Sequence, residues 1–307
     1  MLSIYALIAA LTLQTPIFCM VAQAPPCCDG CAKRAAEAAK NAGVDSLDAL
    51  LTHIEHSGQE LRAFTADVRY EIVDELLGRR EIRTGEMIYR VDDAAGKSFA
   101  VLFDRLMIPP RSQTRLRHYI FSDRWLVEVD HEAKQFIKRE IVAPGQQLDP
   151  LKLGEGPIPL PIGQPKDEVL ARFDASLIEA PPSGSDDPMA GLRHVDGLRL
   201  VPKKGTSEAR EYEQVDIFYD RATWLPVGIH AIEVGGNRKI VRLNNLAHNP
   251  TLSAQQLAKL SVKEPDPRQW AIDVQEAATD APLACRRRVP ADRCVRRRAA
   301  AAGTAAC

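Results

Sequence analysis

The sequence predicts a mainly β protein with a small helical part, an α+β class built around one antiparallel sheet. Apolar and polar residues alternate with a period of two in ten segments between residues 64 and 246. Short clusters of turn-forming residues separate most of these segments, which favours hairpins between consecutive strands. Only two segments show the spacing of an amphipathic helix, so few helices are available to cover the apolar face of the sheet.

The first predicted helix covers residues 45–64. The apolar residues at helical spacing are Leu47, Leu50, Leu51, Ile54 and Leu61. Asp45 or Ser46 stands where a side chain caps the first turn. His53 and His56 flank the apolar stripe at a spacing that could serve one metal ion. No third ligand accompanies them, so we expect solvent-facing histidines and no metal site.

The predicted strands follow the first helix and continue almost to the end of the folded part. They cover residues 64–72, 87–91, 99–103, 117–121, 125–129, 136–141, 198–200, 215–219, 227–232 and 240–246. Turn residues such as Ser122 with Asp123, and Gly235 with Gly236, lie between them. We therefore expect an antiparallel meander with one apolar and one polar face.

A proline-rich segment and a second helix interrupt the meander. The helix is predicted over residues 165–173, with Asp167 near its start and Arg172 near its end, as the helix dipole favours. Prolines alternate with large aliphatic residues over residues 157–162, so this stretch is extended and cannot join a central strand. It is either a loop over an apolar opening or a packed crossover.

The N-terminus is typical of an export signal. Its first 24 residues carry no Asp, Glu, Lys or Arg, and the apolar run over residues 4–13 is too short to span a bilayer. Ala22 and Ala24 supply the small residues that a signal peptidase recognises, so we expect a mature chain starting near Pro25. An uncleaved N-terminal anchor is the alternative.

The cysteines are confined to the two ends of the chain. They are Cys19, Cys27, Cys28, Cys31, Cys285, Cys294 and Cys307. Export would place the last six in an oxidising space where they could pair. Cys28 and Cys31 could instead form a redox or metal half-site, but the βαβ setting or further ligands that such a site needs are not visible. We favour cysteines that staple the ends or remain in disordered segments.

Charge is distributed unevenly. Residues 281–307 hold seven Arg and one Asp, whereas the other 280 residues hold 33 basic and 40 acidic groups, a net charge of −7. A mildly acidic body does not favour nucleic-acid binding, which needs clustered positive charge on the folded domain. The basic tail is predicted to be disordered, either solvated or in contact with anionic lipid head groups.

Catalytic motifs are missing from the sequence. It contains no nucleophile elbow, no HExxH and no phosphate-cradling glycine pattern. We therefore expect a protein that is not an enzyme and needs no cofactor.

The order of elements, with several short motifs, resembles the periplasmic lipoprotein carrier family (LolA-like) of the LolA–LolB–RseB superfamily. The motifs are Phe64-Thr65-Ala66-Asp67, Gly85-Glu86-Met87-Ile88-Tyr89-Arg90, Ser122-Asp123-Arg124-Trp125, Val215-Asp216-Ile217-Phe218-Tyr219-Asp220 and Leu243-Asn244-Asn245. The resemblance implies an unclosed antiparallel β-barrel (half-barrel) over residues 45–275, covered by helices. The remaining parts are then a signal peptide (1–24), a cysteine-containing linker (25–44) and the basic tail (276–307).

The resemblance implies a function in outer-membrane lipoprotein sorting. Such a protein is a monomeric periplasmic chaperone that binds lipid and transports lipoproteins, and an inner-membrane lipoprotein-releasing transporter and an outer-membrane acceptor would be its partners. The candidate lining of its apolar cavity is Leu50, Leu51, Ile54, Val68, Tyr70, Phe99, Val101, Phe103, Ile120, Trp125 and Val127. Acyl chains gain about 0.8 kcal/mol per buried methylene in such a hollow.

Two points remain open at the level of sequence. Arg90 matches the family arginine that holds the lid closed, or it is an outward-facing strand residue. The fold also serves regulators, so a lipid or lipoprotein sensor, or a scaffold with a packed interior, is the alternative to a carrier.

Overall fold

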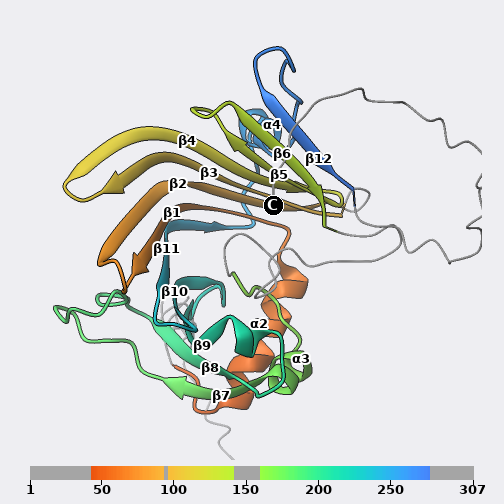
Figure 1. Ribbon diagram of the computed structural model, residues 1–307. Helices are drawn as coiled ribbons and strands as arrows, with labels where there is room; N and C mark the ends of the chain where they lie inside the picture. Colours follow the sequence, from red (N-terminus) through yellow and green to blue (C-terminus); the bar gives the residue numbers. More distant parts are fainter. Residues whose placement is uncertain (1–42, 93–95, 142–159, 277–307) are drawn as a thin grey trace, which may run out of the picture. The chain divides into compact units, whose positions relative to one another are not determined.

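The computed structural model describes residues 43–92, 96–141 and 160–276 (Figure 1). The chain divides into two units, residues 1–43 and 44–307, and the second unit holds the fold. The predicted signal peptide, all seven cysteines, most of the proline-rich segment and the basic tail lie outside the described residues.

One twelve-stranded sheet forms the body of this unit. Its strands are β1 (Ala63–Asp74), β2 (Arg79–Asp92), β3 (Gly96–Ile108), β4 (Arg111–Ser122), β5 (Trp125–Asp130), β6 (Gln135–Glu140), β7 (Phe173–Ile178), β8 (Val195–Pro202), β9 (Tyr212–Asp220), β10 (Pro226–Glu233), β11 (Arg238–His248) and β12 (Ala271–Gln275). Each of the ten predicted segments lies within or overlaps one of these strands. The prediction of a mainly β fold is therefore confirmed.

The strand order is β12-β6-β5-β4-β3-β2-β1-β11-β10-β9-β8-β7. Consecutive strands pair antiparallel within β1 to β6 and within β7 to β11, and β1 pairs with β11 to join these two halves. Strand β12 pairs with β6 in parallel. Because β12 and β7 form the two edges, the described sheet is unclosed, as expected.

Three α-helices accompany the sheet in the described part of the chain, and one of them was not predicted. Helix α2 (Leu47–Glu60) is capped by Ser46, whose hydroxyl accepts a hydrogen bond from the amide of Ala49 at 3.2 Å. It ends before residue 64 because Leu61 adopts an extended conformation and leads into β1. Helix α3 (Lys166–Arg172) matches the prediction, whereas α4 (Ala254–Lys259) is too short and polar to be found by periodicity. Within the described residues, no helix is long and apolar enough to cross a membrane.

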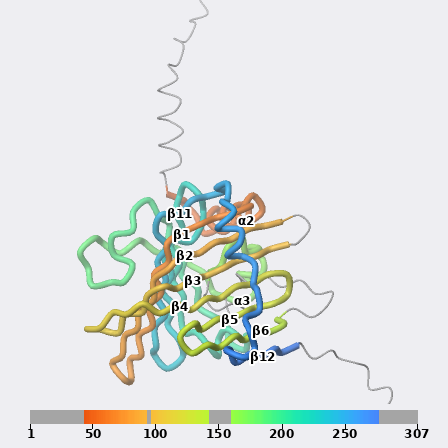
Figure 2. Tube along the Cα trace, turned by 90° about the horizontal axis from the view of Figure 1, so that it is seen from above, coloured from red at the N-terminus to blue at the C-terminus, as the bar shows by residue number. Residues whose placement is uncertain are grey.

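Both faces of the sheet carry apolar clusters. The main core lies on one face, and in Figure 1 strands β7 to β11 curl around α2, which contributes Leu50, Leu51 and Ile54 to it. On the opposite face, residues 252–272 pack across β2 to β6, as Figure 2 shows for this C-terminal segment. Successive side chains of a strand point to opposite faces, so these central strands are apolar on both sides.

Candidate functional site

Eight of the predicted cavity residues meet on one face of the sheet, in the main core. They are Leu50, Leu51, Ile54, Val68, Tyr70, Phe99, Val101 and Phe103, and none is more than 8% exposed. The helix contributes the first three and strands β1 and β3 the other five. The same cluster also holds Leu198 of β8, Val215 of β9 and Val241 of β11, so residues from both halves of the sheet form one continuous apolar interior.

The placement of Ile120 and Val127 in this interior was wrong. Ile120 lies directly opposite both Ala100 of β3 and Val127 of β5, and paired residues share a face. Ala100 alternates with the interior residue Val101, so all three side chains point to the other face. There Ile120 packs with Leu260 of the C-terminal segment.

Trp125 also shares the face of Val127, because the two residues are two positions apart in β5. Its ring is half-buried, and the Lys138 Nζ lies 4.4 Å from the ring centroid. The interior positions of β4 are instead Tyr119 and Phe121.

Three short elements cover the interior, and we call them the lid: helix α2, the strap (residues 160–164) and helix α3. The strap buries Leu160 and Ile162 in the main core, and α3 buries Val169 there. The proline-rich approach to α3 is thus packed against the core at its described end. This favours a covering role for the strap.

The strap crosses α2 at two glycines. A Cβ atom added to Gly58 of α2 would overlap the Cα of Gly163, and the reverse is also true. Gly163 has a φ of +62°, which side chains other than that of glycine rarely accept. The backbones of lid helix and strap therefore touch directly.

Polar contacts tie the lid to the strands beneath it. The Tyr219 hydroxyl donates to the carbonyl of Pro161 at 3.4 Å. The Ser57 hydroxyl lies 3.2 Å from the carbonyl oxygen of Trp224, although its shorter hydrogen bond, at 2.8 Å, is to the carbonyl of Ile54 within α2. Burial raises the pKa of the Tyr219 phenol, so this hydroxyl keeps its proton. Lys166, at the start of α3, forms an ion pair with Asp48 of α2.

Arg172 is the most extensively bonded cation of the lid. Its guanidinium donates to Glu208 Oε1 at 2.6 Å and to Gln164 Oε1 of the strap at 3.1 Å. Burial would raise the pKa of Glu208, but hydrogen bonds from its own amide, Arg172 and Ser207 outweigh burial and hold the pKa below its ordinary value. Glu208 therefore stays ionised beneath the lid.

Arg90 does not hold the lid among the described contacts. It shares the outer face with Ile88, two positions away in β2, and forms an ion pair with Asp92 of the same strand. The lid-gate assignment is therefore corrected, and Arg172 is the arginine that bonds to the strap. Sequence reasoning missed this role because Glu208 lies 36 residues from Arg172.

The cavity that the described residues leave between the lid and the core is small. The residual cavity has a volume of about 10 Å³ and is lined by Leu51, Ile54, Pro161, Gln164, Val169, Arg172, Phe173, Leu198, Leu200 and Tyr219. This is room for about one water molecule, whereas small-molecule sites occupy about 300–1,000 Å³. In this state the interior is packed with the chain's own side chains.

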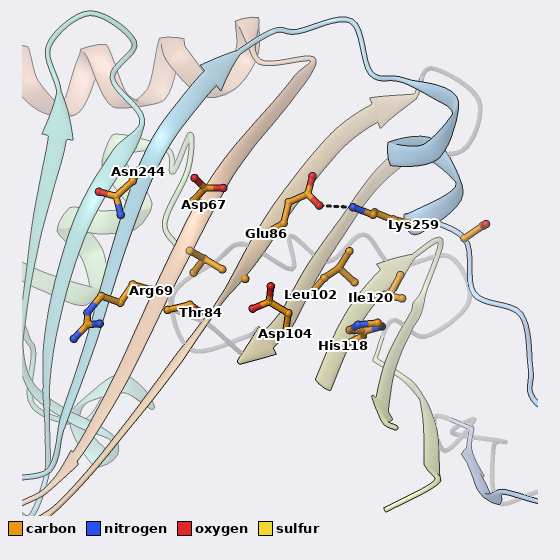
Figure 3. A pocket seen from close by; sticks show the side chains of 13 residues that line it. Asp67, Arg69, Thr84, Glu86, Leu102, Asp104, His118, Ile120, Asn244 and Lys259 are labelled. Carbon is orange, nitrogen blue, oxygen red and sulfur yellow. Dashed lines mark hydrogen bonds and ion pairs between the residues drawn. The ribbon is translucent and has the colours of Figure 1, made fainter. Parts of the chain in front are cut away.

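A larger, open hollow of about 790 Å³ lies on the opposite face of the sheet (Figure 3). Its lining is Asp67, Val68, Arg69, Thr84, Gly85, Glu86, Leu102, Asp104, His118, Ile120, Asn244, Lys259 and Ser261. Charges of both signs share it, and Glu86 is paired with Lys259 of α4. Its lining is mixed, with charged side chains beside Leu102 and Ile120.

A histidine pair lies beside this hollow. His118 Nδ1 is 3.2 Å from His131 Nε2, and the His131 ring meets the ring of Trp270 edge to face at 5.6 Å. Burial first, and then the nearby His131 and Lys259, lower the pKa of His118 to about 4. The pair links strand β4 to the C-terminal segment.

The structure shows no metal centre in its described part, where no three His, Cys, Asp or Glu side chains gather in ligand geometry. His53 stacks on Trp224, with ring centroids 4.4 Å apart. His56 is exposed.

The chain is similar in fold to several solved structures. No protein-family model matches it, and no curated protein matches its sequence. MucB is 14% identical with a TM-score of 0.40, over 70% of this chain and 64% of MucB, so the match spans less than two thirds of that protein. At identities this low, the likeness is one of fold alone.

Two further structures are matched over nearly their whole length. A putative outer membrane lipoprotein-sorting protein domain from Vibrio parahaemolyticus is 8% identical with a TM-score of 0.32, over 69% of this chain and 95% of that one. A LolA superfamily protein from Nitrosomonas europaea is 10% identical with a TM-score of 0.28, over 69% and 97%.

Proposed function

We propose that the chain is a periplasmic carrier that takes up the acyl chains of lipoproteins, or other lipids, beneath its lid. The observation that carries this proposal is the continuous apolar face that spans both halves of the sheet and that, among the described residues, α2, the strap and α3 cover. The described state is then the form with the lid closed. Opening requires α2 and the strap to leave the interior.

The free-energy cost of opening the lid is comparable with the free energy gained when an acyl chain is buried in its place. Opening removes Leu50, Leu51 and Ile54 from the core, at a cost of about 1.5–3 kcal/mol for each side chain that becomes fully exposed. A bound acyl chain returns about 0.8 kcal/mol per buried methylene. A chain of ordinary length can therefore replace the lid side chains, and a closed lid keeps the apolar face from aggregating when no cargo is bound.

The same proposal includes location and partners. Export to the periplasm, with a mature chain starting near Pro25, would be followed by loading from a lipoprotein-releasing transporter and unloading to an outer-membrane acceptor. The role is not enzymatic and needs no cofactor, because exchange of buried apolar surface supplies the free energy.

A second candidate is a regulatory scaffold or lipoprotein sensor that does not carry cargo. The residual cavity of about 10 Å³ favours it, because an interior this full behaves as an ordinary core. In this case α2 is a permanent part of the fold and does not move to admit lipid.

Two measurements distinguish the candidates. A carrier purified without detergent should contain endogenous lipid by mass spectrometry. A photoreactive fatty acid should label interior residues such as Tyr70 and Phe103, and should not label residues of the opposite face such as Ile88. Absence of lipid together with labelling of neither face would contradict the carrier.

The activity itself is tested with an acylated cargo. The chain should keep a purified triacylated lipoprotein soluble without detergent and co-elute with it from a sizing column. The matched control is the same lipoprotein with its acylated cysteine replaced by serine, which should elute separately. Equal co-elution of both forms would point to recognition of the protein part and favour the sensor.

A further inference from the structure

The most exposed large apolar side chains of the described residues gather in two hairpin turns. Leu76 is 90% exposed and Leu77 is 71% exposed in the turn between β1 and β2, and Val234 is 53% exposed at the turn between β10 and β11. Leaving such side chains in water has a cost that a folded protein usually avoids. Their grouping therefore points to a contact surface.

The two turns are neighbours. Arg238 at the start of β11 is paired with Val73 at the end of β1 and forms an ion pair with Glu75. The Asn237 side-chain oxygen accepts a hydrogen bond from the amide of Glu75 at 3.3 Å. Figure 2 shows the β1–β2 turn projecting from the body of the unit.

We propose that these turns, residues 74–79 and 233–237, form a membrane-docking tip that inserts Leu76 and Leu77 into the surface of a lipid bilayer containing anionic lipids. A projecting turn can insert into the fluid apolar layer of a membrane, because the membrane does not need a pocket of complementary shape as a protein partner would. This inference does not depend on the lipid-binding interior, which lies under the lid.

Two backbone amides of the β1–β2 turn have hydrogen-bond partners within the tip, which lowers the cost of moving the turn into the membrane. The amide of Leu77 donates to Asp74 Oδ1 at 2.9 Å, and the amide of Glu75 is bonded to Asn237. Unsatisfied amides are costly to bury in lipid, and these two already have partners within the tip.

The charges around the leucines fit the head-group region. Arg79 and Arg80 follow the turn directly and are ion-paired with Glu81 and Glu71, yet their side chains remain 57% and 54% exposed and can also reach lipid phosphates. At about 3.3 Å per strand residue they lie within one head-group depth of the leucines, where lipid phosphates attract cations. Glu75, the acidic neighbour of Leu76, is neutralised by Arg238.

The test is flotation of the full chain with vesicles of phosphatidylcholine and phosphatidylglycerol in a 3:1 ratio. We expect binding that the double variant Leu76→Ser/Leu77→Ser weakens by about tenfold or more in partition coefficient. The matched control is Leu116→Ser, which removes another exposed leucine, on β4 and outside the tip, and should bind as the unaltered chain does.

A second measurement is specific to the tip, because other segments of the full chain can contribute to vesicle binding. Leu76→Trp should add fluorescence that brominated lipids quench, whereas Leu116→Trp should add fluorescence that they do not quench. Equal flotation of the double serine variant, equal quenching at both positions, or no flotation at all would overturn the proposal. A dimer that the double serine variant dissociates would assign the tip to a second copy of the chain and would also overturn it.

Discussion

Gly58 of helix α2 and Gly163 of the strap touch backbone to backbone, although 104 residues separate them in the chain. This contact lets the strap lie flat on the helix and holds both over the apolar interior. A side chain at either position has to push the two elements apart, so the contact is a sensitive point at which to test whether the lid opens.

Gly58→Ala should loosen the lid. The added methyl group overlaps the strap, so we expect the free energy of unfolding to fall by about 1–3 kcal/mol and the uptake of a fluorescent acyl probe to rise. His56→Ala, at an exposed position of the same helix, should change neither. A loss of stability without any gain in uptake would support the packed scaffold.

Gly163→Ala tests the same contact from the strap. It adds the strain of a positive φ to the overlap, so its matched control is Gly184→Ala, which also has a positive φ but nothing within 4 Å. Probe uptake should rise for Gly163→Ala and remain unchanged for Gly184→Ala.

Arg172→Met should weaken the lid, whereas Arg90→Leu should not. The first change leaves the buried Glu208 without its guanidinium partner, which costs about 1–3 kcal/mol of unfolding free energy. The second removes a half-exposed ion pair that is worth about 1 kcal/mol or less. Chemical denaturation measures both, and a larger effect at Arg90 would restore its lid-gate role.

Acid should weaken the ion pair between Glu208 and Arg172 and so lower the stability of the fold. Its pKa is lower in the folded chain than in the unfolded chain, so the stabilisation is present above the ordinary carboxyl range and is lost as pH falls through the folded pKa. In denaturation curves between pH 5 and pH 2, Glu208→Gln should reduce the decline in stability. An unchanged slope would show that Glu208 does not contribute.

The histidine pair predicts a second pH effect at higher pH. The pKa of His118 falls from 6.5 to about 4 on folding, so the unfolded chain binds a proton that the folded chain does not. Stability should therefore decline as pH falls from 6.5 to 4. His118→Asn should flatten this decline, whereas His248→Asn, at an exposed position, should leave it unchanged; equal slopes for both variants would contradict the assignment.

The sequence by itself determined ten of the twelve described strands and the two lid helices, but it did not predict β7 or β12. In β1, alternation placed Val68 and Tyr70 on the interior face correctly, because only that face carries an unbroken apolar row. Helix α2 was found from its apolar stripe, and the limits of α3 from its flanking charges. These are local properties, which side-chain period and turn chemistry fix within a few residues.

Only the tertiary structure decided which side chains of the central strands point into the interior and which contacts hold the lid closed. In β4, Tyr119 and Ile120 are both apolar because the C-terminal segment covers the outer face, so alternation there could not tell interior from exterior. The contact of Gly58 with Gly163 and the bond of Arg172 to Glu208 join residues distant in the chain. Such contacts depend on how the elements pack in space, and no local pattern in the sequence records them.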